Sequence, residues 1–231
     1  MTGSRAGVAA GVAALVATLL AGAAPAGEAE LAGAARVLDG DTLDIGPVRV
    51  RVHGIDAPEF SQTCAAAGGS EWTCGKAAAA RLGALIRDRR VVCDPRERDQ
   101  YGRIVARCEA GGVDLGGALV AEGLAWAFVR YSDDYEATEA AARAAGLGIW
   151  QAETMTAWDW RATAWRDAAG NAADDAPGDC PIKGNISRSG ERIYHTPWSR
   201  DYAKVRIDEG LGERWFCDEA EAQAAGWRPP R

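Results

Sequence analysis

The segment VRVRVHGIDAPE at residues 48–59 constrains the fold more than any other stretch of the chain. Its valines alternate with two arginines and a histidine, and this period of two predicts a strand that buries one face. Pro58 lacks an N–H donor and disfavours helical backbone at the residue before it, so the strand must end in a loop. The strand and its loop therefore present one cation, Arg51, and two carboxylates, Asp56 and Glu59, within nine residues.

A second acidic turn, DGDT at residues 39–42, precedes this segment and leads into a predicted strand at residues 43–45. Carboxylates from two neighbouring strand ends can hold a hard cation, which prefers oxygen ligands. An arginine beside them can bind a phosphate group through two parallel N–H donors. Together the two turns predict metal-assisted attack on a phosphodiester bond.

Hydrophobic periodicity predicts further elements along the chain. In the stretch 76–90, Leu82, Leu85 and Ile86 follow helical spacing, and Asp114 stands where it can cap a second helix. We expect strands at residues 90–94, 103–109 and 126–131, and helices at residues 76–90, 115–122 and from Asp133 or Asp134 to Gly146. Short strands interleaved with helices place the chain in the α+β class.

Three motifs occur in order: DGDT at residues 39–42, RxxxxDAPE at residues 51–59 and DQYGR at residues 99–103. Together they resemble the staphylococcal nuclease (thermonuclease) family, from about residue 36 to about residue 150. The resemblance implies an OB-type five-stranded Greek-key barrel with about three helices. It also implies a calcium-dependent nuclease that hydrolyses phosphodiester bonds of DNA and RNA with little sequence preference.

The same resemblance assigns a role to each motif residue. Two arginines would stabilise the charge that builds on the phosphate, a glutamate would activate or orient the attacking water, and carboxylates with a backbone carbonyl would hold the metal. The implied catalytic residues are Arg51, Glu59 and Arg103, the implied metal ligands are Asp41, Asp56 and the carbonyl of Ala57, and the implied substrate-binding residues are Tyr101 and Tyr131. We interpret Asp39 as a turn residue.

Some positions depart from the family pattern. Ala57 stands where threonine is more common, which matters little because the ligand there is a backbone carbonyl. Gln100 replaces a lysine, and Val129 replaces an aromatic residue of the nucleotide pocket. We therefore expect substrate affinity and base preference to differ from those of the family more than catalysis does.

The oxygen-only ligand set indicates Ca²⁺ as the cofactor. A zinc site is a weak alternative, because the chain has no C-x-x-C pair and only two histidines.

Composition divides the chain into four predicted segments. Residues 1–26 resemble a signal peptide, with an apolar run and a small-residue cleavage site, which predicts a secreted or periplasmic protein; an uncleaved membrane anchor is the alternative. Residues 34–166 would form the nuclease-like domain, and residues 167–179, rich in Gly, Ala, Asp and Pro, a linker. Residues 180–231 would form a small disulfide-stapled accessory module, which we expect to stand apart from the active site.

Six cysteines in an exported chain fit three disulfides. Their spacing suggests the local pairs Cys64–Cys74, Cys93–Cys108 and Cys180–Cys217, although six cysteines allow about fifteen pairings.

The negative net charge of the chain is unfavourable for binding nucleic acid. The chain has 26 Lys and Arg against 33 Asp and Glu, a net charge of −7, so binding DNA or RNA would require its arginines to gather on one face. The alternative is a non-catalytic module, on the same barrel, that binds nucleic acid or the cell envelope. That alternative predicts loss of the catalytic residues, which are present. Envelope contact through residues 180–231 is a further option, and no stable protein partner is implied.

Overall fold

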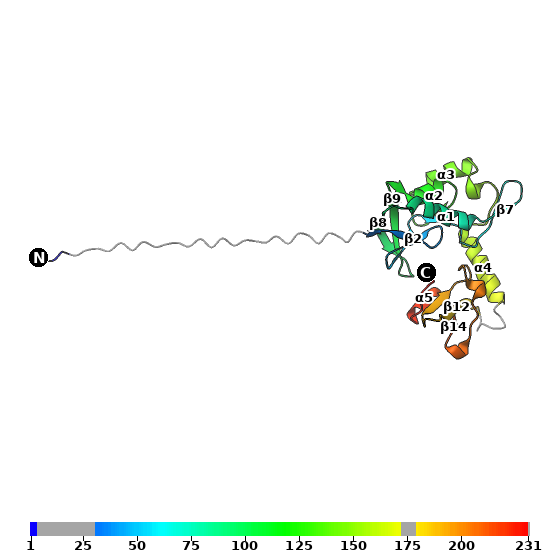
Figure 1. Cartoon of the computed structure of the whole chain (residues 1–231). Helices are drawn as coiled ribbons and strands as arrows, with labels where there is room; N and C mark the ends of the chain where they lie inside the picture. Colours follow the sequence, from blue (N-terminus) through cyan, green and yellow to red (C-terminus); the bar gives the residue numbers. More distant parts are fainter. Residues whose placement is uncertain (4–30, 172–178, 231) are drawn as a thin grey trace.

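The computed structural model describes residues 1–3, 31–171 and 179–230. The predicted signal peptide lies outside the described residues except for its first three, as does most of the predicted linker. Figure 1 shows two bodies, one containing a large sheet with three helices and one containing the C-terminal strands, joined by a single helix. None of the helices within the described ranges is long and apolar enough to cross a membrane.

The large sheet has the strand order β1-β8-β9-β4-β3-β2, with β10 paired to β9. Its strands are β1 (Leu31–Gly33), β2 (Ala35–Val37), β3 (Thr42–Ile45), β4 (Val48–Val52), β8 (Val91–Arg98), β9 (Ile104–Ala110) and β10 (Val113–Asp114). The pair β4 and β9 is parallel and the others are antiparallel. The α+β class is confirmed. Among the described strands β1 does not pair with β2, so the sheet is not closed and the OB-type barrel is not confirmed.

Two helices cover the apolar face of this sheet, α1 (Cys74–Ile86) and α2 (Leu115–Ala121), and a third, α3 (Glu136–Ala144), packs against α2. Val50 and Val52 of β4 are buried in that core, as their alternation predicts. The helix expected at residues 76–90 ends earlier, because Arg87 is extended and Asp88 adopts a positive φ of 57°. Asp114 caps α2 by accepting a hydrogen bond from the backbone N–H of Gly117, as expected.

The predicted strand 48–55 is interrupted by a turn at Gly54, which has a φ of 75°. The chain then forms β5 (Ile55–Asp56), which pairs with β11 (Trp126–Ala127) and places Asp56 opposite Trp126. This second pairing separates Asp56 from the main sheet and fixes its backbone on a different strand from that of Arg51.

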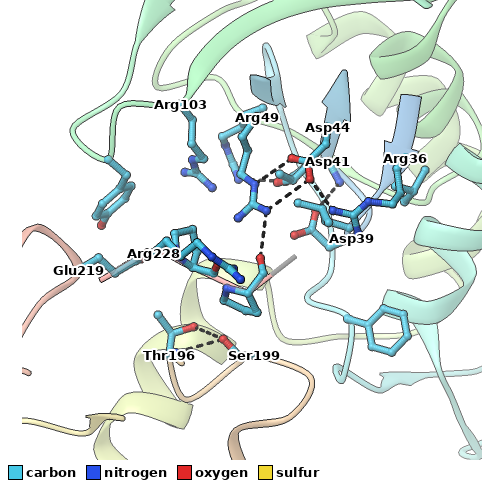
Figure 2. A pocket seen from close by; sticks show the side chains of 18 of the residues that line it. Arg36, Asp39, Asp41, Asp44, Arg49, Arg103, Thr196, Ser199, Glu219 and Arg228 are labelled. Atoms are coloured by element: carbon cyan, nitrogen blue, oxygen red, sulfur yellow. Dashed lines mark hydrogen bonds and ion pairs between the residues drawn. The ribbon is translucent and has the colours of Figure 1, made fainter. Parts of the chain in front are cut away.

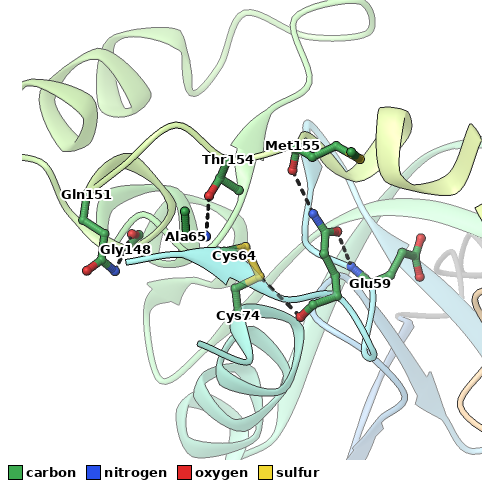
Figure 3. Close-up of a disulfide and its surroundings, with 9 residues drawn as sticks. Glu59, Cys64, Ala65, Cys74, Gly148, Gln151, Thr154 and Met155 are labelled. Carbon is green, nitrogen blue, oxygen red and sulfur yellow. Dashed lines mark hydrogen bonds between the residues drawn. A yellow bond between two sulfur atoms is a disulfide. The ribbon is translucent and has the colours of Figure 1, made fainter. Parts of the chain in front are cut away.

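All three predicted disulfides are present, and no cysteine is free. Cys93–Cys108 joins directly opposite residues of β8 and β9. Cys64–Cys74 ties the hairpin of β6 (Cys64–Ala65) and β7 (Glu71–Trp72) to the first residue of α1 (Figure 3). Cys180–Cys217 closes the C-terminal body.

The C-terminal body contains a three-stranded sheet of order β13-β12-β14 and a short helix. Its elements are β12 (Ile182–Ile186), β13 (Arg192–His195), β14 (Arg214–Phe216) and α5 (Glu219–Ala224), with 3-10 turns at Tyr202–Lys204 and Glu209–Leu211; a third such turn, Gly148–Trp150, precedes α4. The joining helix α4 (Ala157–Asn171) continues into the stretch predicted as a linker. Trp165 of α4 packs against the core of the C-terminal body, so α4 contributes to both bodies.

Candidate active site

Five charged side chains form a continuous chain of ion pairs at the ends of β3, β4 and β5. Arg51 donates from Nη1 to Asp41 Oδ1 (3.0 Å) and from Nη2 to Asp56 Oδ1 (2.8 Å). Arg161 of α4 donates from Nη2 to Asp56 Oδ2 (2.8 Å), and from Nη1 to Asp56 Oδ1 (3.2 Å) and Glu59 Oε1 (2.8 Å). Carboxylates and guanidinium groups therefore alternate in the order Asp41, Arg51, Asp56, Arg161, Glu59.

Backbone geometry brings the two acidic turns together. In the register of β3 with β4, Thr42 lies opposite Arg51, which places Asp41 next to the arginine. Asp41 Oδ2 accepts a hydrogen bond from the backbone N–H of Ala57 (3.0 Å) and so ties the first turn to the DAPE loop. Asp39 accepts from the backbone N–H of Asp41, as expected for a turn residue.

Glu59 is held in place by its own loop and by α1. The side-chain Oε1 of Gln62 accepts from the backbone N–H of Glu59 (3.2 Å), and its Nε2 donates to the carbonyl of Met155 (2.8 Å). Gly75, the second residue of α1, lies so close that a Cβ there would be 1.7 Å from the carbonyl oxygen of Glu59. Figure 3 shows Glu59 and Met155 on the same side of the Cys64–Cys74 disulfide.

Burial and charge shift the ionisation of these groups. Burial raises the pKa of Glu59 to about 8, although Arg161 opposes the shift. Burial alone would also raise the pKa of Asp41, but Arg51 and the N–H of Ala57 outweigh it and lower that pKa. The network contains three carboxyl groups and two guanidinium groups, so a proton on Glu59 makes it neutral overall.

The hydrogen bonds of Asp41 and Asp56 show which of their carboxylate oxygens could bind a cation. Each carboxylate oxygen has two acceptor positions. Asp41 Oδ1 accepts from Arg51 and Thr42, and Asp56 Oδ1 accepts from both arginines, which fills these two oxygens. Asp41 Oδ2 and Asp56 Oδ2 each accept one hydrogen bond and keep one position. These hard oxygens, with the carbonyl of Ala57, fit calcium, which also takes water and phosphate oxygens as ligands.

The carboxylates alone do not make a complete metal site. Within residues 1–3, 31–171 and 179–230, no group of three or more His, Cys, Asp or Glu side chains is arranged to hold a metal ion. Calcium binding at Asp41 and Asp56 would therefore depend on backbone carbonyl, water and substrate oxygens.

The three predicted catalytic residues line one cavity of about 1320 Å³. Arg103 reaches it from the DQYGR turn, where Asp99 accepts hydrogen bonds from the Arg103 side chain and from two backbone N–H groups of the turn. Tyr101 also lines the cavity, and its ring centroid lies 5.4 Å from the Arg103 guanidinium carbon. The DQYGR turn and the two acidic turns thus converge on one space.

The C-terminal body forms the opposite wall of this cavity. Figure 2 shows Asp41 and Arg103 on one side and Thr196, Ser199 and Glu219 on the other. Arg49 of β4 donates to the carbonyl of Pro230 (2.9 Å), and the guanidinium of Arg200 lies 4.0 Å from the ring centroid of Phe60. The expectation that residues 180–231 stand apart from the active site is therefore wrong: two contacts between the bodies bring the module over the cavity.

The cavity lining carries slightly more positive than negative charge in an acidic protein. Seven arginines line it, against six aspartate and glutamate residues: Arg36, Arg49, Arg51, Arg98, Arg103, Arg200 and Arg228 against Asp39, Asp41, Asp44, Glu59, Asp201 and Glu219. Five of these arginines form ion pairs with carboxylates: Arg36, Arg49, Arg51, Arg103 and Arg228. The chain as a whole has a net charge of −7, so the lining is less acidic than the chain and close to neutral.

Tyr131 is placed differently from the other predicted residues. It is 58% exposed, its ring packs on Phe128 with centroids 4.9 Å apart, and it is not among the described residues that line the cavity. β11 ends at Ala127 and the chain turns at once, so the expected extended stretch 126–131 does not carry Tyr131 to the cavity.

Sequence reasoning missed two residues of the site. Arg161 has no local signal in the sequence, because its partners Asp56 and Glu59 are 105 and 102 positions away. Gln62 is fully buried but stands in a polar stretch that resembles a surface insertion. Its position three residues after Glu59 is the one local signal that could have indicated it.

Comparison with known families gives two matches on this chain. A sequence model of the family described as Staphylococcal nuclease homologue matches residues 49–152, which contain every predicted catalytic, metal-binding and substrate-binding residue except Asp41. A second model, described as ArfC, matches residues 162–229. Arg161 lies between the two matches.

Curated relatives cover more than half of the chain. It is 38% identical over 134 residues to the succinoglycan biosynthesis protein ExoI of Rhizobium meliloti (strain 1021), an alignment that covers 55% of this chain and 69% of that protein. It is 33% identical over 144 residues to the micrococcal nuclease of Shigella flexneri, covering 54% and 77%. It is 32% identical over 152 residues to protein ParB of Escherichia coli, covering 58% and 80%.

Proposed function

Because the chain belongs to the staphylococcal nuclease homologue family, we propose that it hydrolyses phosphodiester bonds of nucleic acid in the cavity between its two bodies. The observation that carries this proposal is the convergence of Arg51, Glu59 and Arg103 on that cavity. They come from two motifs that are separate in the sequence, residues 51–59 and 99–103, and each has the chemistry that phosphodiester hydrolysis needs.

Each of these side chains has a distinct part in the proposed reaction. Glu59 orients the attacking water and, in its ionised form, accepts the proton of that water, for which a carboxylate at the cavity wall is suited. Arg51 and Arg103 stabilise the negative charge that grows on the phosphate oxygens and the leaving oxygen as phosphorus becomes five-coordinate. Tyr101, beside Arg103, offers a ring surface for a base or sugar of the substrate.

Calcium is the cofactor that we propose for this site. Asp41, Asp56 and the carbonyl of Ala57 would hold it, and when bound it supplies positive charge that polarises the phosphate group. The support is the pair of free oxygen positions on the two carboxylates, both of which are buried. Export through the segment at residues 1–26 and closure of the sheet into an OB-type barrel are part of the same proposal and rest on the sequence motifs alone.

Nucleic acid is the substrate that the cavity suits. Its volume of about 1320 Å³ exceeds the ~300–1,000 Å³ of a pocket for one drug-sized ligand, which favours a short stretch of polymer. The arginines along its wall exceed the acidic residues there by one positive charge, and they can contact phosphate groups. The alternative is a non-catalytic module that binds nucleic acid or the envelope. The residues that the C-terminal body adds to the cavity would serve binding in that case as well.

Digestion of single-stranded DNA by the oxidised protein tests this proposal, with calcium in one arm and a chelator in the other. We expect cleavage with calcium, none in chelator, and no recovery with zinc, because the ligand set contains only oxygen atoms. Glu59→Gln is the control, since it keeps the shape of the side chain and removes the base. Full activity in chelator would refute the calcium assignment, and binding without cleavage in any arm would favour the non-catalytic alternative.

A further inference from the structure

Asp41 lies before the start of the segment matched by the nuclease family, and Arg161 is the member of the charged network that lies beyond its end. It lies on α4, nine residues beyond the match to residues 49–152 and one residue before the match to residues 162–229. Its side chain is 23% exposed, and within the described part of the chain its guanidinium donates hydrogen bonds to Asp56 and Glu59.

We propose that Arg161 is a positioning residue that fixes Asp56 and Glu59 relative to each other, so that a helix shared with the C-terminal body completes the active site. This inference rests on the proposed phosphodiesterase function. A single nitrogen, Nη1, bridges Asp56 Oδ1 and Glu59 Oε1, while Nη2 holds the second oxygen of Asp56. One rigid, planar group thereby sets the distance and orientation between two carboxyl groups that are three residues apart.

The location of the guanidinium suits this positioning role. Glu59 lines the cavity, whereas neither Arg161 nor Asp56 is among the described residues that do so. Arg161 therefore meets Glu59 from outside the cavity and leaves the side that faces substrate open. Asp56 is fully buried, and a buried carboxylate requires a paired cation with good hydrogen-bond geometry. Lysine could not make the same set of hydrogen bonds as Arg161, because an ammonium group is a point charge without paired planar donors.

α4 carries Arg161 between two anchors on one helix face. Ala157, Arg161 and Trp165 are spaced four residues apart, so they lie one above the other. Ala157 is fully buried in a cluster with the Cys64–Cys74 disulfide and Trp126 of the first body. Trp165 packs against the C-terminal core, with its ring centroid 6.2 Å from that of Trp198. Arg161 thus lies one helical turn from Ala157, which packs in the first body, and one helical turn from Trp165, which packs in the C-terminal body. The C-terminal body therefore supports its position.

Steady-state cleavage of single-stranded DNA in calcium tests the role of Arg161. We expect Arg161→Ala to lower kcat by about 10- to 100-fold, with KM changed by less than about threefold, because the loss disturbs the position of the base and not the binding of substrate. Arg161→Lys should lose less than Arg161→Ala. Arg166→Ala is the matched control, since Arg166 is an exposed arginine of the same helix that donates a hydrogen bond to Thr163, and it should stay within about twofold of the unsubstituted protein.

Chemical rescue separates positioning from a general structural role. Millimolar guanidinium added to Arg161→Ala should restore part of kcat in a saturable way and leave Arg166→Ala unchanged. A kcat for Arg161→Ala within twofold of the unsubstituted protein would overturn the proposal, and so would a higher kcat, which would make Arg161 a block on the site. Should Arg161→Ala fail to fold, Arg161→Lys takes its place, and an unchanged kcat in that variant has the same consequence.

Hydrogen exchange in chelator, without substrate, tests the inference independently of cleavage. The backbone N–H groups of Ala57 and Glu59 donate to Asp41 and Gln62, so they should be protected while the loop is fixed. We expect faster exchange in peptides covering residues 55–62 in Arg161→Ala and no change there in Arg166→Ala. If the unsubstituted protein cleaves no substrate, the proposed function fails and this measurement still decides the positioning role. Equal exchange in both variants would overturn it.

Discussion

At the scale of single residues, the site alternates three carboxyl groups with two guanidinium groups, so it contains one more acidic than basic side chain. Asp41, Asp56 and Glu59 share two guanidinium groups, so full ionisation of all three would leave an unpaired negative charge in a buried place. Burial raises the pKa of Glu59 to about 8, so we expect Glu59 to hold the proton that resolves this imbalance in the metal-free protein. A cation at the free oxygens of Asp41 and Asp56 would favour the ionised form of the same group.

The first prediction concerns the dependence of stability on pH. Since burial raises the pKa of Glu59 from 4.5 to about 8, the folded metal-free protein holds a proton that the unfolded chain releases between these values. Its contribution to the free energy of unfolding is full below pH 4.5 and is lost as the pH rises to about 8. Urea denaturation in chelator should show this decrease. Asp39, whose pKa burial and Asp41 raise to about 6, adds a decrease in the same direction.

Glu59→Gln isolates the contribution of Glu59, because glutamine does not titrate. The decrease in unfolding free energy between about pH 5 and about pH 8 should be smaller in this variant than in the unsubstituted protein. The same decrease in both proteins would show that the proton is not on Glu59.

At the scale of elements, α1 determines where Glu59 lies. The helix begins at Cys74, which is fixed by its disulfide, and its next residue has no side chain to separate it from the loop. A Cβ at Gly75 would be 1.7 Å from the carbonyl oxygen of Glu59, so the helix and the loop can approach this closely only with glycine.

Gly75→Ala should therefore displace Glu59. We expect kcat on single-stranded DNA to fall by about 100-fold, because a shift of about 1 Å in a catalytic group has an effect of this size. Gly83→Ala is the matched control, since Gly83 is in the same helix and a Cβ there meets nothing within 4 Å. That variant should keep its activity and gain about 0.5–1 kcal/mol in stability. Equal activity in the two variants would show that α1 does not set the position of Glu59.

Local elements were predictable from the sequence and long-range ones were not. The strands around the DGDT turn, the hairpin of β8 and β9 and the cap of α2 follow from residues that are neighbours in the chain. The full length of α4 was missed because its Ala-, Gly- and Asp-containing end resembles a linker, whereas its helical form depends on packing of Trp165 against residues downstream. Arg161 was missed for a related reason: no local pattern marks an ion pair that spans 105 positions.

At the scale of the whole molecule, the C-terminal body turns an open face into a cavity. Composition predicted a separable module, because the break near residues 167–179 and the separate disulfide are all that the sequence shows. The contacts of Arg49 with Pro230 and of Arg200 with Phe60 instead place this body over the catalytic residues. The motifs predict that Arg51, Glu59 and Arg103 act on the substrate, and the structure adds the wall of the cavity that faces them.

The wall should contribute to binding of substrate. Arg200→Ala removes an exposed cation at the cavity edge, so we expect KM for single-stranded DNA to rise and the salt dependence of binding to weaken, with kcat nearly unchanged. Arg188→Ala, a change of the same charge at an exposed position of the same body outside the cavity lining, should leave both constants unaltered. A KM that Arg188→Ala raises as much as Arg200→Ala does would indicate an effect of net charge alone.

The turnover of Arg51→Ala, Glu59→Gln and Arg103→Ala on single-stranded DNA in saturating calcium tests most directly whether these three residues carry out the cleavage. We expect each substitution to lower kcat by about 10²- to 10³-fold, the effect of removing one group that stabilises the transition state. Each variant should still show a cooperative unfolding transition above the assay temperature, and Arg188→Ala should match the unsubstituted protein. Near-normal turnover in any of the three would contradict the assignment of that residue, and near-normal turnover in all three would place the reaction elsewhere in the molecule.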